Sequence, residues 1–462
     1  MKKVFLLVTG FLLLDAGIVA QAVSQRLQNA FAAFEKDEQL KHAISSLYVI
    51  DAKTGQVIFD KNSQIGLAPA STQKIITSVT AFELLGREYR YETNLGYVGE
   101  IVSGKLKGDI IVKPSGDPTF GSWRWLGTSE ETLLKKFVNS IVQRGIKDIL
   151  GSVDIIKSNW STQFFPDGWI VQDIGNYYGA GSVALNWREN QFEVFLKSGD
   201  AIGDSVKITG YKPELFSQSY ISEVRSAKKG SGDNAYIYQN PNVIRGTIPV
   251  GENKFVISGS MQMPSREFQN TFGAELLSAG IDLNAPNMSK FNYDIDSFKT
   301  IYTHYSPSLD SIIYWFNKKS INLYGEALIK TFAYEKQGFG STDSGVAIVK
   351  KFWKEKGLDE DELNIYDGSG LSPLNRVTTH AQVEILKYAK TKDWFPYFLK
   401  SLPEYNSMTM KSGTISDVKG FCGYHKAKDG KEYIFSFLVN NYSGKSSQLV
   451  GKMYKVLDEL KL

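Results

Sequence analysis

The chain has 462 residues, of which 42% are hydrophobic and 22% are charged, a composition that is ordinary for a globular protein of roughly two to four domains. Its formal net charge of +4 gives no case for nucleic-acid binding, although it is compatible with an anionic polymer as ligand. The single cysteine, Cys422, excludes an intrachain disulfide, and the four histidines are too scattered for a zinc motif, so we expect neither metal nor cofactor.

Residues 1–22 have the pattern of a secretory signal peptide. Lys2 and Lys3 precede an apolar run over residues 4–14, and Ala20-Gln21-Ala22 offers a cleavage site between small residues. The apolar run is too short to span a bilayer comfortably, and no later segment is a transmembrane candidate. We therefore predict an exported, periplasmic protein without a transmembrane segment in the mature chain.

The next segments predict a helix, a hairpin and a second helix. Residues 29–43 have a helical pattern, and in residues 44–62 apolar side chains alternate around a turn at Lys53-Thr54-Gly55. In residues 67–86 apolar side chains recur at helical spacing until Gly86 ends the pattern.

Ser71 lies at the start of this second helix, where two interpretations are open. Serine is a favoured N-cap, because its oxygen accepts a backbone N–H of the first turn. A capping serine usually has Glu or Gln three residues later, but here Lys74 places a cation at the positive end of the helix dipole. Residues three apart share a helix face, so Lys74 can reach the Ser71 hydroxyl and take its proton. Ser71 is either a helix cap or a nucleophile.

The rest of the chain divides into a strand-rich and a helix-rich block. Residues 91–294 carry strand patterns separated by turn signals, with one clear helix over residues 130–145. From residue 308 onward the patterns predict four amphipathic helices, then a hairpin that turns at Lys428-Asp429-Gly430, and a last helix from about Ser447. The four helices span residues 308–320, 321–336, 341–357 and 378–390.

Because the two outer parts of the chain are alike, we predict one mixed α/β domain that is interrupted by an insertion. Residues 23–90 and 295–462 form the discontinuous domain, and residues 91–294 form the inserted β-rich part, which we expect to comprise two domains.

Three short motifs are weak singly but informative in combination. S-x-x-K occurs at Ser71–Lys74, Ser226–Lys229 and Ser416–Lys419, and K-[ST]-G begins at Lys53, Lys197 and Lys411. Lys53-Thr54-Gly55 precedes Ser71 and is explained by turn chemistry. S-x-N is found at Ser320-Ile321-Asn322, where two predicted helices meet. Ser71, Ser320 and Lys411 therefore give the order of elements that acyl-enzyme serine hydrolases use. Taken alone, Ser320 can be a helix cap and Lys411 a solvated strand lysine.

These motifs and their context resemble the low-molecular-mass class C penicillin-binding proteins, the D-Ala-D-Ala carboxypeptidase/endopeptidases of the penicillin-binding protein 4 type. The resemblance covers nearly the whole mature chain and is carried by ASTQKIIT, KSINLYGEAL, DGSGLS at residues 367–372, KSGT, and KPSGDPTF near the start of the insertion. It implies a serine β-lactamase/D,D-peptidase-like domain, with an antiparallel sheet flanked by helices, into which a large β-rich insertion is placed between Ser71 and Ser320.

The resemblance also implies a function and a set of site residues. The implied enzyme is a serine D,D-peptidase that cleaves peptidoglycan stem peptides after D-Ala through an acyl-enzyme and is inhibited by β-lactams. Ser71 attacks, Lys74 is the base, Ser320 relays a proton to the leaving amine, and Asn322 orients Lys74 and binds a substrate amide. The implied substrate-binding residues are Lys411, Ser412, Gly413 and Thr414.

The chain departs from the family pattern at two places. Ser412 replaces the commoner Thr but keeps the hydroxyl. Pro373 follows DGSGLS, where members of the family often carry an Arg that helps to recognise the free end of the stem-peptide side chain, and Arg376 is the candidate to replace it. Two rival hypotheses are a β-lactamase or esterase of the same fold and an inactive wall-binding protein. The motifs are common to carboxypeptidases and endopeptidases, which differ only in the leaving group.

Overall fold

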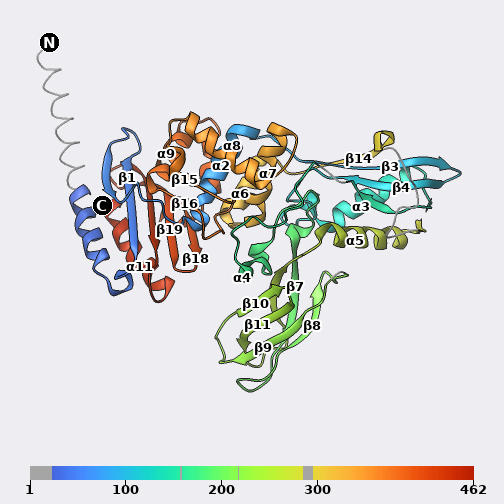
Figure 1. The fold of residues 1–462 in the computed structure, drawn as a ribbon, viewed down its shortest axis with the longest axis horizontal. Coiled ribbons are helices and arrows are strands. Elements are labelled where there is room, and N and C mark those ends of the chain that lie inside the picture. The colour runs from blue at the N-terminus through green and yellow to red at the C-terminus, as the bar shows by residue number, and fades with distance from the viewer. Residues whose placement is uncertain (1–22, 157–158, 217, 285–294, 462) are drawn as a thin grey trace, which may run out of the picture. The chain divides into compact units, whose positions relative to one another are not determined.

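A computed structural model describes residues 23–156, 159–216, 218–284 and 295–461, and its contacts divide the chain into two compact units (Figure 1). Unit 1 contains the chain up to Leu84, then Ile313–Ser320, and everything from Val346 onward. Unit 2 contains Leu85–Ile312 and Ile321–Gly345. The predicted signal peptide, residues 1–22, lies outside the described residues.

The boundaries of the units differ from the predicted domain boundaries. Unit 2 begins at Leu85 and includes the helical segment Ile321–Gly345, whereas the predicted insertion spans residues 91–294. The assignment of residues 23–90 and 295–462 to one domain stays a prediction.

Unit 1 is built on a six-stranded sheet in the order β17-β18-β19-β20-β1-β2, in which every neighbouring pair is antiparallel. The strands are β17 (Glu404–Tyr405), β18 (Met408–Ile415), β19 (Val418–Lys426), β20 (Glu432–Asn440), β1 (Ile44–Asp51) and β2 (Val57–Lys61). The predicted hairpins over residues 44–62 and around Lys428-Asp429-Gly430 are therefore confirmed. The N-terminal and C-terminal strands pair in the middle of the sheet, where β1 lies against β20.

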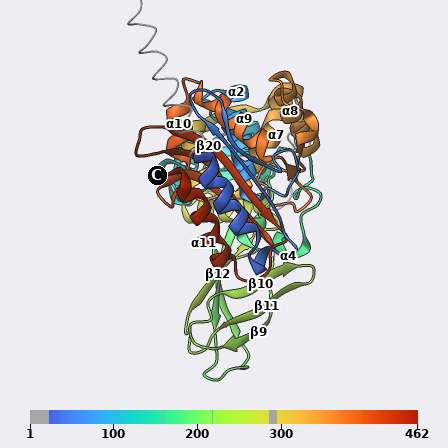
Figure 2. The ribbon, with the colours of Figure 1, turned by 90° about the vertical axis from the view of Figure 1, so that its left-hand side faces the viewer.

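Helices cover both faces of this sheet. The helix over residues 23–35 and α11 (Ser446–Leu457) lie side by side on one face (Figure 2). Successive residues of a strand point to opposite faces, so Leu47 and Val49 of β1 pack into the core under these two helices. Ser46 points the other way, and its hydroxyl lies 2.6 Å from that of Thr379, the first residue of α9 (Thr379–Lys390).

The helices predicted in the C-terminal part are confirmed. They are α6 (Leu309–Lys318), α7 (Asn322–Gln337), α8 (Thr342–Glu355) and α9. A short helix that was not predicted, α10 (Phe395–Ser401), follows α9. In unit 1 a two-stranded ladder, β15 (Leu363–Asn364) with β16 (Arg376–Val377), closes the loop that carries DGSGLS.

Unit 2 holds a second sheet in the order β13-β5-β4-β3-β14, with β6 paired to β4. Its strands are β3 (Glu92–Val102), β4 (Lys105–Lys113), β5 (Asp148–Ile149), β6 (Val153–Ile155), β13 (Asp282–Leu283) and β14 (Lys299–Tyr305). Phe137 of α3 (Glu130–Gln143) and Phe268 and Phe272 of α5 (Pro264–Ser278) pack into the core of this unit. The predicted helix over residues 130–145 is thus confirmed as α3.

Two three-stranded sheets complete unit 2, in the orders β10-β11-β9 and β12-β7-β8. Their strands are β7 (Gln191–Lys197), β8 (Lys207–Lys212), β9 (Ile221–Ala227), β10 (Asn234–Gln239), β11 (Asn242–Pro249) and β12 (Phe255–Ser260). The β-rich character predicted for this part of the chain is confirmed, but α5 was missed.

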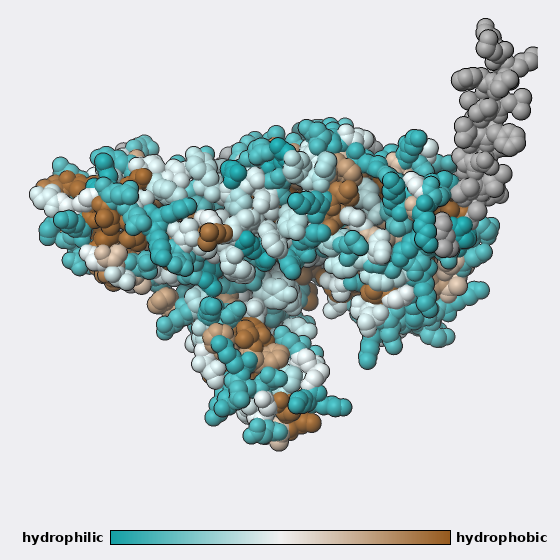
Figure 3. Space-filling view, turned by 180° about the vertical axis from the view of Figure 1, so that it is seen from behind, coloured by the Kyte–Doolittle hydropathy of each residue, from teal (hydrophilic) through white to brown (hydrophobic). Residues whose placement is uncertain are grey.

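The surface seen in Figure 3 is mainly hydrophilic, and its hydrophobic side chains gather in separate small areas. Within the described ranges, no helix has both the length and the apolar character that crossing a bilayer requires.

Candidate active site

Ser71 lies in a short 3-10 turn, η2 (Ala70–Gln73), that runs directly into α2 (Lys74–Leu85). The cap residue of this turn is Pro69, and no side chain makes a cap hydrogen bond there. The interpretation of Ser71 as a helix cap is therefore wrong. Ala70, the residue before it, has a φ of 47°, a left-handed conformation that costs energy in a residue with a side chain. Such strain is found where the surrounding structure holds a residue in a functional position.

The Lys74 amine points at the Ser71 hydroxyl. Nζ lies 3.0 Å from Oγ of Ser71 and donates a second hydrogen bond of 2.7 Å to the backbone carbonyl of Ser369. Lys74 is fully buried, and the Phe316 ring centroid is 5.6 Å from its Nζ. A buried amine with these fixed contacts is positioned to exchange a proton with the serine.

The loop that supplies the Ser369 carbonyl is held against η2 by Asp367. One Asp367 carboxylate oxygen accepts hydrogen bonds from Gln73 Nε2 at 3.1 Å, Gly370 N at 2.8 Å and Asn375 Nδ2 at 3.0 Å, and the other accepts from Ser372 N at 2.7 Å. A Cβ at Gly370, whose φ is 82°, would lie 2.0 Å from the Ala70 carbonyl oxygen. The loop thus depends on glycine to approach the backbone of the serine turn.

Lys411 of β18 is a second buried lysine in unit 1. Its Nζ lies 3.1 Å from Ser320 Oγ and 2.8 Å from the Ser412 carbonyl oxygen, and the residue is only 1% exposed. The interpretation of Lys411 as a solvated strand lysine is therefore wrong. Burial, with a smaller contribution from the charge of Lys419, lowers the pKa of Lys411 to about 7. An anionic partner would offset this cost of burial and stabilise the ammonium form of Lys411.

Ser320 is not the cap of the helix that follows it. The cap residue of α7 is Ile321, which has no side-chain cap bond, and Ser320 itself has a φ of 55°. The contact with Lys411 and the strained backbone together mark Ser320 as a residue of the candidate site.

Gly413 brings β18 against the backbone of η2. A Cβ on this glycine would lie 2.6 Å from Pro69 O, 2.9 Å from Thr72 N and 3.0 Å from Ser71 N. The third motif therefore lies directly beside the nucleophile candidate, with Ser412 and Thr414 on either side of the contact. Any larger residue at position 413 would push the strand away.

Thr414 has a partner, Lys419, that was not among the predicted site residues. Its Oγ1 accepts a 2.7 Å hydrogen bond from Lys419 Nζ on β19, and burial lowers the pKa of Lys419. The only sequence signal for this lysine was its membership of the third S-x-x-K match, Ser416–Lys419. That match spans the turn between β18 and β19.

Asn322 begins α7 in unit 2, two residues after Ser320 in the chain. Its amide Nδ2 donates a 2.7 Å hydrogen bond to the Tyr178 carbonyl, and the residue is buried. Its predicted role of orienting Lys74 stays a prediction.

Burial settles the case of Cys422 but not that of Arg376. Cys422 is fully buried, and desolvation raises the pKa of its thiol to about 12, so it is not a reactive thiolate. Arg376 donates to the Pro373 and Asn375 carbonyls, and its predicted part in substrate recognition stays a prediction. Among the residues described, no group of three His, Cys, Asp or Glu side chains is arranged to hold a metal ion.

The geometry supports one chemistry. A serine hydroxyl has a buried amine within hydrogen-bond distance, and beside it lie a second buried amine, a hydroxyl and a strand that carries further hydroxyls. This arrangement suits nucleophilic attack by serine on an acyl compound that also bears a carboxylate.

Comparisons with known proteins agree with this chemistry. A family model described as the D-Ala-D-Ala carboxypeptidase 3 (S13) family matches residues 27–404. The D-alanyl-D-alanine carboxypeptidase DacB of Haemophilus influenzae is 25% identical over 84% of this chain and 83% of its own length. A D-alanyl-D-alanine carboxypeptidase of Actinomadura sp. strain R39 is 24% identical over 90% of this chain and 81% of its own. The crystal structure of penicillin binding protein 4 (dacB) from H. influenzae superposes with a TM-score of 0.79 at 21% identity, over 96% of this chain and 99% of that one.

Proposed function

We propose that Ser71 is the nucleophile of this chain, which belongs to the D-Ala-D-Ala carboxypeptidase 3 (S13) family and is a serine-type D,D-peptidase, and that its substrate is peptidoglycan. The single observation that carries this assignment is the 3.0 Å contact between Ser71 Oγ and the buried Lys74 amine. Ser71 attacks the carbonyl carbon of the penultimate D-alanine, and Lys74 accepts the hydroxyl proton. The product of this step is an acyl-enzyme on Ser71.

The Lys411 region holds the other end of the substrate. The Lys411 ammonium, with the hydroxyls of Ser412 and Thr414, binds the terminal carboxylate of the stem peptide. Ser320, which contacts Lys411, passes a proton to the leaving amine. Gly413 keeps the strand close enough for the backbone N–H groups of Ser71 and Thr414 to bind the developing oxyanion. Asn322 binds an amide of the substrate.

Water then hydrolyses the acyl-enzyme and frees Ser71. The leaving group is D-alanine in a carboxypeptidase step and a cross-linked side chain in an endopeptidase step, and the same residues serve both. A β-lactam acylates Ser71 in the same way. The resulting adduct is hydrolysed slowly, because the sequence has no motif for a dedicated deacylating base. The protein performs these reactions outside the cytoplasm, after export by residues 1–22.

Intact-mass analysis with penicillin tests the nucleophile. We expect one penicillin adduct per chain in the wild type and none in Ser71→Ala, while Ser416→Ala, which alters the third S-x-x-K match, keeps the adduct. Folding of each variant is checked by circular dichroism. An adduct that persists in Ser71→Ala would refute the assignment.

The lifetime of the adduct separates the peptidase from a β-lactamase of the same fold. Persistence for many turnover times of a D-Ala-D-Ala peptide substrate is the expected result. Rapid loss of the adduct together with penicillin hydrolysis would favour the β-lactamase instead, and a folded wild type without any adduct would revive the inactive wall-binding protein.

A further inference from the structure

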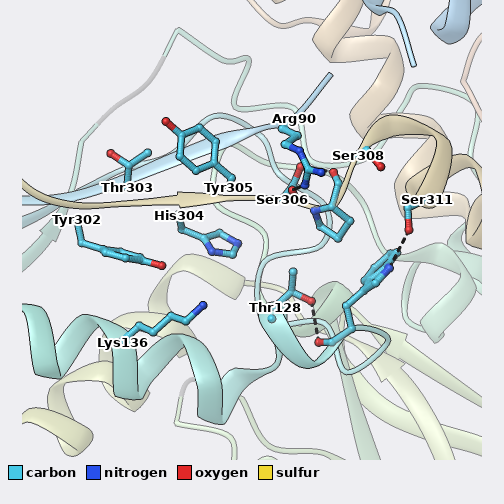
Figure 4. Close-up of a pocket in the computed structure, with 13 residues that line it drawn as sticks. Arg90, Thr128, Lys136, Tyr302, Thr303, His304, Tyr305, Ser306, Ser308 and Ser311 are labelled. Carbon is cyan, nitrogen blue, oxygen red and sulfur yellow. Dashed lines mark hydrogen bonds between the residues drawn. The ribbon is translucent and has the colours of Figure 1, made fainter. Parts of the chain in front are cut away.

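Unit 2 contains a pocket of about 500 Å³ between β14, α3 and the loop that carries η3 (Leu126–Thr128). Figure 4 shows Lys136 rising from α3 toward His304 of β14, with Arg90 and Ser306 on the other side of the same space. All of its lining residues belong to unit 2, so they are separate from Ser71, Lys74 and Lys411 of unit 1.

The pocket has a positive lining. Arg90 and Lys136 are both exposed, and no carboxylate is among the residues that line it. Arg90 Nη1 donates a 2.7 Å hydrogen bond to the Ser306 carbonyl, which holds the guanidinium beside the pocket. Within the described part of the chain, neither cation forms a salt bridge. Two unpaired cations at one hollow favour an anionic ligand.

His304 of β14 lines the pocket and is almost entirely buried. His304 is 3% exposed, and among the described residues its Nε2 has no hydrogen-bond partner. Behind it the buried Asp117 has an equally unpartnered Oδ2 at 3.8 Å, too far for a hydrogen bond. Burial, and then Lys136, lower the pKa of His304 to about 4, so the ring is neutral at pH 7. A neutral imidazole can donate to or accept from a ligand hydroxyl or amide.

An aromatic wall completes the pocket. Trp125 is half-buried, and its indole Nε1 donates a 2.9 Å hydrogen bond to Ser311 Oγ, which fixes the plane of the ring. Tyr302 lines the pocket from β14. Fixed aromatic rings beside cations suit a ligand that combines a flat apolar face, such as that of a sugar ring, with a carboxylate.

We propose that this pocket binds a carboxylate-bearing glycopeptide segment of peptidoglycan, with its carboxylate between Arg90 and Lys136 and a sugar ring against Trp125. The identity of the polymer in this proposal rests on the proposed function. The negative charge of the ligand is inferred from the positive lining of the pocket. The enzyme would thus bind the polymer at a second place, away from the bond that it cleaves.

Isothermal titration of the full chain with a disaccharide–dipeptide tests the proposal. This probe has free carboxylates but no D-alanine, so it lacks the bond that the active site cleaves. We expect the double variant Arg90→Gln/Lys136→Gln to raise the Kd at least tenfold. Lys135→Gln, which removes the neighbouring lysine of α3 that does not line the pocket, is the matched control and should leave the Kd unchanged. Amidation of the probe's carboxylates should weaken binding as much as the double variant does.

Penicillin acylation of the same variants separates this proposal from the proposed function. Acylation should proceed at the wild-type rate in the double variant, which also shows that the protein is folded. A wild type that binds the probe but fails to acylate would overturn the proposed function and leave the pocket assignment intact. Equal affinity of the wild type and the double variant, or no binding to the wild type, would overturn the pocket assignment. Tighter binding of inorganic phosphate than of the probe would overturn the assignment of a carboxylate ligand and would favour a polymer that carries phosphate groups.

Discussion

Lys411 combines a buried position with a proposed role, the binding of a carboxylate, that requires a positive charge. Its pKa of about 7 means that the folded state binds fewer protons than the unfolded state between pH 7 and the ordinary lysine value near 10.5. The free energy of unfolding therefore rises with pH across this window. Well below pH 7 the ammonium is fully formed, and its burial costs stability, a cost that the proposed binding of a substrate carboxylate would explain.

This pKa predicts that the pH profile of the acylation rate constant has a descending limb above pH 7. We expect the second-order rate constant for acylation by a carboxylate-bearing penicillin to fall about tenfold per pH unit above pH 7, because only the ammonium form of Lys411 binds the carboxylate. Stopped-flow measurements with a fluorescent penicillin between pH 5.5 and 9.5 give the profile. Lys411→Arg keeps its charge throughout this range and should lack the limb. The same limb in Lys411→Arg would assign it to another group.

Asp367 is the residue whose replacement should most weaken the DGSGLS loop. Asn at this position places an N–H₂ group where one carboxylate oxygen accepts hydrogen bonds, so that buried donors face each other. We expect Asp367→Asn to cost about 2 kcal/mol of stability, which corresponds to a fall in Tm of roughly 4–8 °C.

Thermal unfolding followed by circular dichroism measures this change. The matched control is Asp361→Asn, at an exposed position, for which we expect a change within about 0.5 kcal/mol. A Tm equal to that of the wild type in Asp367→Asn would show that the loop does not depend on the carboxylate.

At this scale, residue spacing alone predicted only local contacts, whereas the grouping of the distant Ser71, Ser320 and Lys411 was expected from motif order and the family resemblance. The Ser71–Lys74 pair was predicted because three residues of helical chain fix the geometry. The contact of Gln73 with Asp367 joins residues 294 positions apart, and no periodicity or motif spacing encodes such a distance. The pairing of Lys419 with Thr414 was missed for a related reason, since it depends on the register of β18 against β19.

Among the elements, the approach of β18 to η2 is the most sensitive feature of the candidate site. We expect Gly413→Ala to lower the acylation rate constant by about a hundredfold, because the new methyl group would displace the strand by a fraction of an ångström to an ångström from Ser71 N. The fluorescent penicillin assay measures the rate, and circular dichroism reports whether the fold persists.

Gly210→Ala is the matched control for this change. Gly210 lies in strand β8, and its Cβ would meet only Phe195 Cδ2 at 3.5 Å, an ordinary contact. Its acylation rate constant should equal that of the wild type. A wild-type rate in Gly413→Ala would mean that this strand does not position the reacting groups.

Element prediction succeeded where apolar spacing was regular and failed where polar residues masked it. In α3, buried residues recur through Leu133, Phe137 and Ile141, and the helix was predicted within two residues of its end. In α5, the spacing of four is present at Phe268, Phe272 and Leu276, but the positions between them include Asn270, Thr271 and Gly273. Asn, Thr and Gly are weak helix formers, so packing of the apolar face decides the structure.

At the scale of the whole molecule, the two units bury separate cores. The core of unit 1 includes Phe437 and Leu449, and that of unit 2 includes Phe137 and Phe268. We predict two transitions in differential scanning calorimetry. Phe137→Ala should lower one transition, and Phe437→Ala the other, each by the equivalent of about 3–5 kcal/mol.

Penicillin assigns the transitions independently. Acylation of Ser71 should raise only the transition that Phe437→Ala lowers, because ligands stabilise the part that binds them. A single transition that both variants lower would show that the units unfold together.

The central pairing of β1 with β20 has a consequence for the timing of activity during synthesis. Val49 is among the first described residues to be made, and its partner Phe435 is among the last. Until β20 is synthesised, one edge of β1 presents unpaired N–H and C=O groups. Strand β18, which carries Lys411, is made only shortly before β20. Closing the sheet joins the two ends of the chain, a step that must wait for distant contacts. A chain that still lacks β18 and β20 therefore has neither Lys411 nor the closed sheet, so the proposed site is incomplete until both strands have been made.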